Sequence, residues 1–180
     1  MTSETITYGL EKRELKLNFW QKVQHFGIVG FCFILPVTFT VMHLKDYFKN
    51  SFKPLTSGEI WFIIIPTVLG ILLFYLQKSR LKFKEVHTNL NKSQLNNIIE
   101  KVAEELEWHI HTSNSKAIVA RTHPGFSSGS LGEQITILFD HNKVLVNSIC
   151  DPNKKSSLIS LGRNGQNETT LIENIKNASL

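Results

Sequence analysis

A short segment rich in glycine and amide side chains is the part of this sequence best suited to bind a ligand. Gly162 and Gly165 flank Arg163 and Asn164, and Asn167 follows. Unpaired N–H groups at the start of a helix can hold an anion, and a guanidinium group adds a fork of donors. The segment predicts either an anion-binding loop or a structural loop that is fastened to its neighbours through caps and carbonyl groups. It is not a P-loop, because it has no Gly-Lys-Ser/Thr sequence.

Two polar residues interrupt a strand that is otherwise apolar. Asn147 and Ser148 stand inside the segment from Val144 to Cys150. Polar side chains within a strand either face water or satisfy a neighbouring loop. We expect a hydrogen-bonded link to the loop at 156–163, with a ligand contact as the second interpretation. The ligand-binding candidates of this sequence are therefore Arg163, Asn164, Asn167, Asn147 and Ser148.

Two further patterns could carry catalysis. The sequence from Gly125 to Gly129 has the form Gly-x-Ser-x-Gly around Ser127. A nucleophile elbow needs a strand before it, a helix after it, and then an acid and a histidine, and this order does not follow here. His109 and His111 share a strand face, and a metal site would need a further ligand such as His123 or Cys150. The favoured interpretations are an ordinary loop and two solvent-facing histidines, so we predict no catalytic residue, metal ligand or cofactor.

Two apolar runs determine the organisation of the chain that would position these residues. The runs cover 25–44 and 60–76, and neither contains Asp, Glu, Lys or Arg. Each approaches the roughly 20 residues that a helix needs to cross a bilayer. We expect a transmembrane helical hairpin over 25–76, with Pro36 and Pro66 inside its helices. A proton or ion pathway usually needs an ionisable residue within a span, so a transporter is not favoured.

Basic residues crowd both flanks of the hairpin, in a chain of net charge +5. Residues 1–24 are predicted to be an amphipathic basic lead-in, and 77–87 a basic neck at the membrane surface through Lys78, Arg80, Lys82 and Lys84. This charge distribution favours both termini in the cytoplasm, a location in the inner membrane, and anionic lipid headgroups as partners rather than nucleic acid. Cys32 and Cys150 should not meet, which fits a reducing compartment.

The remaining residues, 88–180, predict one small cytoplasmic domain. An apolar stripe at helical spacing follows Ser93, a candidate helix cap. Strands are expected near 108–112, 116–122, 134–140 and 144–150, with a turn at 140–143, and a last helix capped by Asn167. The predicted fold class is α+β: an N-terminal transmembrane hairpin followed by a small α-β-β-β-β-α domain whose antiparallel sheet is covered on one face.

Three stretches of this domain resemble a known family. They are 129–136 (GSLGEQIT), 146–152 (VNSICDP) and 160–164 (SLGRN), the last followed by Asn167. Residues 88–178 are similar to a soluble domain of unknown function in two-span membrane proteins of the Bacteroidetes. The resemblance implies the same order of elements and brings no activity or catalytic residue with it.

The sequence as a whole favours a membrane-anchored accessory or ligand-sensing module that does not catalyse a reaction. One alternative is a membrane-disrupting effector that is gated by a ligand on the soluble domain. A further alternative is a small serine hydrolase that uses Ser127. The expected partners are the lipid bilayer and either another protein or a second copy of the chain.

Overall fold

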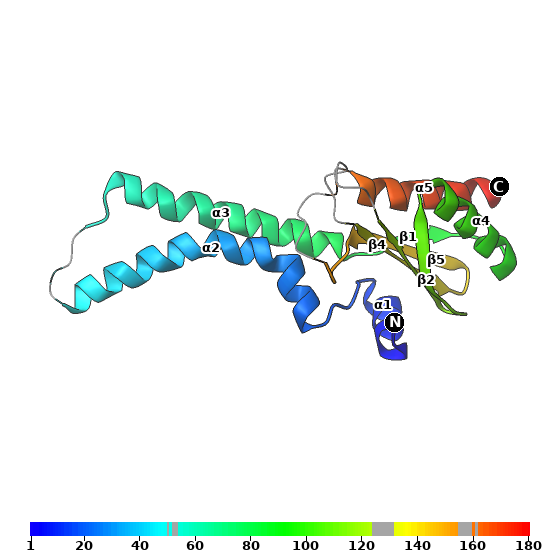
Figure 1. Cartoon of the computed structure of the whole chain (residues 1–180), viewed down its shortest axis with the longest axis horizontal. Coiled ribbons are helices and arrows are strands. Elements are labelled where there is room, and N and C mark those ends of the chain that lie inside the picture. The colour runs from blue at the N-terminus through cyan, green and yellow to red at the C-terminus, as the bar shows by residue number, and fades with distance from the viewer. Residues whose placement is uncertain (50, 52–53, 124–131, 155–159, 161) are drawn as a thin grey trace. The chain divides into compact units, whose positions relative to one another are not determined.

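A computed structural model describes residues 1–49, 51, 54–123, 132–154, 160 and 162–180. The chain forms two compact units (Figure 1). One unit is Phe26–Ser79, and the other joins Met1–His25 to Arg80–Leu180. Residues 1–25 therefore belong to the unit that holds the sheet, although the sequence favoured a separate lead-in over 1–24.

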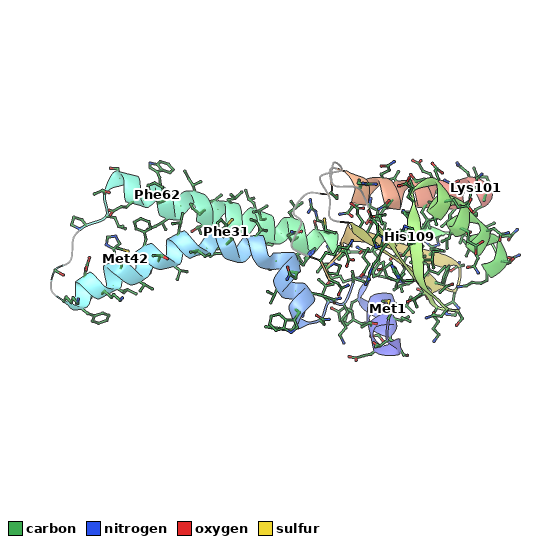
Figure 2. All side chains as sticks on the ribbon, viewed as in Figure 1. Met1, Phe31, Met42, Phe62, Lys101 and His109 are labelled. Carbon is green, nitrogen blue, oxygen red and sulfur yellow. The ribbon has the colours of Figure 1, made fainter. Side chains whose placement is uncertain are left out.

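The smaller unit is a pair of long apolar helices. α2 spans Phe19–Phe48 and α3 spans Ser57–Arg80, so the predicted spans 25–44 and 60–76 lie inside them. Both helices are long and apolar enough to cross a membrane by length and composition. Large apolar side chains project from them, with Phe31 68%, Met42 57% and Phe62 58% exposed (Figure 2).

The two helices touch through a glycine and through aromatic rings. A Cβ atom at Gly70 would lie 2.8 Å from Phe33 Cε2, so the glycine permits the close approach. The rings of Phe39 and Phe62 stack with centroids 6.2 Å apart. Thr40 Oγ1 donates to the carbonyl of Pro36 at 2.8 Å. It therefore does not bond the carbonyl of the preceding turn, which is the group left without a donor because proline has no N–H.

The larger unit is built on an antiparallel sheet in the order β1-β5-β4-β3-β2. This confirms the α+β class and the hairpin that precedes the domain. Four strands occupy the predicted places, and a fifth forms from the end of the predicted neck. The strands are β1 (Lys84–His87), β2 (Trp108–Ser113), β3 (Ala117–Thr122), β4 (Glu133–Asp140) and β5 (Lys143–Cys150).

Two helices cover one side of the sheet, which we call the closed face (Figure 1). α4 (Lys92–Glu105) and α5 (Arg163–Ala178) each bury an apolar stripe there. The core includes Ile99, Ile135, Ile137, Leu171 and Ile175, all fully buried.

Two predicted helix starts were wrong. Asn91 rather than Ser93 caps α4, because Asn91 and Gln94 form a reciprocal capping box. α5 starts at Arg163 after Gly162, whose φ of 86° suits a glycine, so Asn167 lies within the helix.

The other side of the sheet carries α1 (Ser3–Lys12) and the chain that follows it, and we call it the N-terminal face (Figure 1). A second apolar cluster lies beneath this cover, whereas the sequence predicted cover on one face only. A Cβ atom at Gly9 would lie 2.7 Å from Leu138 Cδ1, so this glycine lets α1 pack closely against the strands. The cluster consists of Ile6, Leu15, Leu17, Phe83, Ala117, Leu138, Leu145 and Ile149.

Candidate functional site

Three of the predicted ligand-binding residues meet in one hydrogen-bonded network at the start of α5. Ser148 Oγ lies 3.1 Å from Asn164 Oδ1, and Asn167 Nδ2 donates to Ser148 Oγ at 3.1 Å. The indole Nε1–H of Trp108 donates to Asn167 Oδ1 at 3.1 Å. Asn167 thus bonds to two strands at once, and its side chain is turned away from the helix end it was expected to cap.

Glu168 extends this network to the edge of the sheet. β1 pairs with β5 only from Lys143 to Val146, so the backbone beyond that point lacks a β1 partner. Glu168 Oε1 accepts the Ser148 backbone N–H at 2.8 Å, and Glu168 Oε2 lies 2.8 Å from Lys84 Nζ. These contacts fasten α5 to β5 and β1.

Arg163 points to a different group on the closed face. Its Nε lies 3.9 Å from Glu133 Oε2, which also accepts a hydrogen bond from Thr122 Oγ1. Glu133 is fully buried, and its Oε1 has no hydrogen-bond partner among the described residues. Arg163 therefore compensates a buried carboxylate of the sheet instead of joining the network of Ser148 and Asn167.

Asn147 faces the opposite side of the sheet, because successive strand residues alternate. Its Nδ2 donates to the backbone carbonyls of Arg80 and Lys82 at 2.8 and 3.0 Å. Within the same segment, Leu15 N donates to Leu81 O at 2.8 Å and Phe83 N donates to Arg13 O at 2.9 Å. The chain entering the helical hairpin and the chain leaving it are thus bonded to each other and to the sheet.

The four basic residues of the predicted neck have different surroundings. Lys78 and Arg80 belong to the last turns of α3. The backbone of Lys82 forms an isolated antiparallel β-bridge with that of Glu14. Lys84 is the first residue of β1, and its side chain forms an ion pair with Glu168. Contact of these side chains with lipid headgroups stays a prediction.

The other chemical patterns of the sequence give no assembled site among the described residues. The Gly125–Gly129 motif lies outside them. His109 and His123 have ring centroids 5.1 Å apart, and His111 and His123 6.3 Å. In the described part of the chain, no three His, Cys, Asp or Glu side chains are arranged to hold a metal ion. Cys32 and Cys150 are free thiols.

A pocket of about 570 Å³ lies on the N-terminal face, where α1 and the chain after it leave β2 and β3 partly uncovered. Its floor is formed by side chains of the sheet, including Val119, Arg121 and Gln134. Its wall is formed by the segment that precedes the apolar run of α2, including Lys16, Asn18 and Gln21. Gln21 Nε2 also donates to Asn153 Oδ1 at 3.0 Å, which holds this wall against the loop after β5.

Charged side chains are paired around this pocket. Arg121 Nε lies 3.4 Å from Asp151 Oδ2, whose side chain is only 2% exposed. Lys16 bonds to Glu4, and this hydrogen bond, together with the charge of Lys16, lowers the pKa of the Glu4 carboxyl. Arg121 and Lys16 were not among the site residues expected from the sequence. The strand alternation of 116–122 was a usable signal for Arg121, but nothing local indicated that residues 15–21 would lie beside it.

No protein-family model matches this chain, and no curated protein compared with it shows significant similarity. The resemblance to two-span proteins of the Bacteroidetes stays a prediction. A functional conclusion must therefore come from the geometry of the site itself.

Proposed function

We propose that this protein is a membrane-anchored ligand-sensing module, with its ligand bound in the pocket of the N-terminal face. The observation that carries the proposal is the composition of the pocket lining. The floor belongs to the sheet, and the wall belongs to residues 15–21, which include the first residues of α2. A ligand in this pocket touches both the sheet and residues 15–21, and it changes how strongly this segment is held against the sheet.

The route from the pocket to the hairpin is short along the chain. Leu15 and Arg13 are bonded to Leu81 and Phe83, and Asn147 holds the chain after α3. Ligand binding at Lys16 and its neighbours therefore acts on the segment that joins both ends of the hairpin. This is a binding role, and it needs no reaction at the site.

Exposed apolar side chains on α2 and α3 support a lipid bilayer as the first partner. Phe31, Leu35, Leu69 and Leu72 are each about half exposed or more. Contiguous apolar surface of this kind is rare on soluble monomers. The proposal places the chain in the inner membrane with both termini in the cytoplasm, and with anionic headgroups near the basic flanks. A protein partner or a second copy of the chain is expected beside the hairpin.

The proposal is tested with the full chain in lipid nanodiscs. Membranes washed with alkaline carbonate should retain the chain. A small-molecule thermal-shift screen then identifies a ligand, and hydrogen exchange should slow at 13–17 and 81–83 when it binds. Val119→Trp fills the pocket and should abolish the effect. Ile110→Trp adds the same bulk on the closed-face side of β2 and should leave it intact.

Release of the chain by carbonate would contradict the anchoring. Equal ligand protection in Val119→Trp and in the wild-type chain would show that the pocket is not the binding site.

A further inference from the structure

The pocket is lined by basic side chains from both the sheet and the segment that covers it. Arg121 is on β3, and His111 and the neighbouring His109 are on β2. Lys16 lines the opposite wall. The lining acid Glu4 is paired with Lys16, and Asp151, which is in contact with the lining residue Arg121, is paired with that guanidinium group.

Arg121 has unused hydrogen-bonding capacity in this position. Its Nε is buried at 3.4 Å from Asp151 Oδ2 and has no hydrogen-bond partner in the described part of the chain. Asp151 Oδ1 is occupied by the backbone N–H and the side-chain amide of Asn153, at 3.0 and 3.1 Å. Asp151 thus orients the guanidinium group from one side, while about a third of the Arg121 side chain stays accessible. A planar guanidinium fork held in this way is suited to a carboxylate or a phosphate.

We propose that the pocket binds a small ligand bearing a phosphate or carboxylate group, with Arg121 as its principal contact and His111 and Lys16 beside it. This inference rests on the proposed function and names the ligand class. The same anionic chemistry is offered by a soluble metabolite and by a lipid headgroup. Asn18 and Gln21 line the pocket and precede the first apolar run by only a few residues, so both sources are tested.

The electrostatics around His123 agree with this ligand class. Desolvation by neighbouring groups lowers the pKa of His123 first, and the positive charges of Lys154, His109, His111 and Arg121 lower it further. These groups come from β2, β3 and the loop after β5, so the positive potential is shared by several elements. A bound anion would counter that potential.

The experiment titrates the full chain with sodium phosphate in phosphatidylcholine nanodiscs, at constant ionic strength set with sodium chloride. Binding is followed by calorimetry and by hydrogen exchange at 13–17. Arg121→Gln should weaken phosphate binding by about tenfold to a hundredfold, since it removes a charge-assisted hydrogen bond. Lys101→Gln removes one charge from the exposed surface of α4 and should change nothing (Figure 2).

Arg121→Gln leaves Asp151 buried without its cation, so a second variant guards against misfolding. Arg121→Gln with Asp151→Asn keeps a neutral polar pair and should lose phosphate binding equally. A parallel arm replaces free phosphate with phosphatidylglycerol in the nanodisc. Slower hydrogen exchange at 13–17 with either anion, lost in both Arg121 variants, supports the proposal. Which of the two anions produces it tells a soluble ligand from a lipid headgroup.

Wild-type affinity in the double variant, or no response to phosphate or phosphatidylglycerol, would overturn the anionic ligand class. If a neutral compound still protected 13–17 and Val119→Trp abolished that protection, the sensing function would stand without this inference. Loss of every ligand response would remove both.

Discussion

The two faces of the sheet are covered in different ways, and the difference separates a packed core from an open pocket. On the closed face, α4 and α5 lie across the strands and bury Ile99, Ile137 and Ile175 completely. On the N-terminal face, one short helix and an extended segment cover part of the strands and leave the pocket of about 570 Å³. A fully packed face supplies most of the apolar burial, so the other face can keep an open site without loss of the fold.

The N-terminal face is also the face that is connected to the hairpin. Arg13 bonds Asp140 at 2.8 Å and lies 3.2 Å from Glu85, so the cover is fixed by ion pairs as well as by apolar contacts. Residues 15–21 then run past the pocket into α2. We expect changes on the closed face to alter global stability, and changes on the N-terminal face to alter the attachment of this segment.

The largest effect is expected in the core of the closed face. Ile137→Ala removes a fully buried side chain between the sheet and the helices and should lower the free energy of unfolding by about 2–5 kcal/mol. Urea unfolding of the chain in detergent measures it. Ile110→Ala, at a position that is 40% exposed, is the control and should cost less than about 1 kcal/mol. Equal losses would show that the closed face is not a packed core.

A smaller effect is expected at the link between the N-terminal face and the chain after α3. Asn147→Ala leaves the carbonyls of Arg80 and Lys82 without their amide donor and should cost about 1–3 kcal/mol. Hydrogen exchange should speed up at Phe83 and Leu15. Asn174→Ala removes a hydrogen bond within α5 and should stay within about 0.5 kcal/mol of the wild-type chain. Unchanged exchange in Asn147→Ala would argue against the link.

Replacement of two helical glycines by alanine should change the stability of the chain in opposite directions. Gly165→Ala on α5 adds a Cβ atom into open space and should stabilise the chain by about 0.4–1 kcal/mol. Gly9→Ala on α1 places its Cβ atom against the fully buried Leu138 and should destabilise by about 1 kcal/mol, because the helix must move off the strands. Thermal unfolding of both variants decides this. Stabilisation by Gly9→Ala would show that α1 does not pack closely on the sheet.

The smallest effect is a pH dependence at the edge of the N-terminal face. Desolvation and nearby positive charges lower the pKa of His123 below its usual value of 6.5, so the folded chain binds this proton less readily than the unfolded chain. The stability that neutral His123 allows is therefore fully present above about pH 6.5, and it is lost as the pH falls through the lowered pKa. His123→Gln should reduce the loss of stability between pH 7 and pH 5. An unchanged pH profile would count against a positive potential at this edge.

Much of the fold could be predicted from local patterns. The charge-free runs predicted both long helices, and alternating apolar residues predicted the strands from Trp108 to Cys150. A hydrogen-bonded link from Asn147 or Ser148 to the loop at 156–163 was expected; the described contacts of Ser148 instead reach Asn164 and Asn167 within α5. Asn147 was grouped with them from its position beside Ser148, but alternation along the strand sends it to the opposite face.

The sequence by itself determined the two long apolar helices, the strand segments from Trp108 to Cys150 and the apolar stripe of α4, because these depend on residue spacing within a few turns or pleats. It did not determine α1 or β1. Only the tertiary structure decided that residues 1–25 would lie on the sheet, that Arg121 would lie near Lys16, and that a pocket would remain between them. The spacing of apolar residues in the N-terminal segment suits packing on a lipid surface and packing on a sheet face equally well. The complementary surface, with Leu138 opposite Gly9 and with Asp140 and Glu85 beside Arg13, exists only once distant strands have paired.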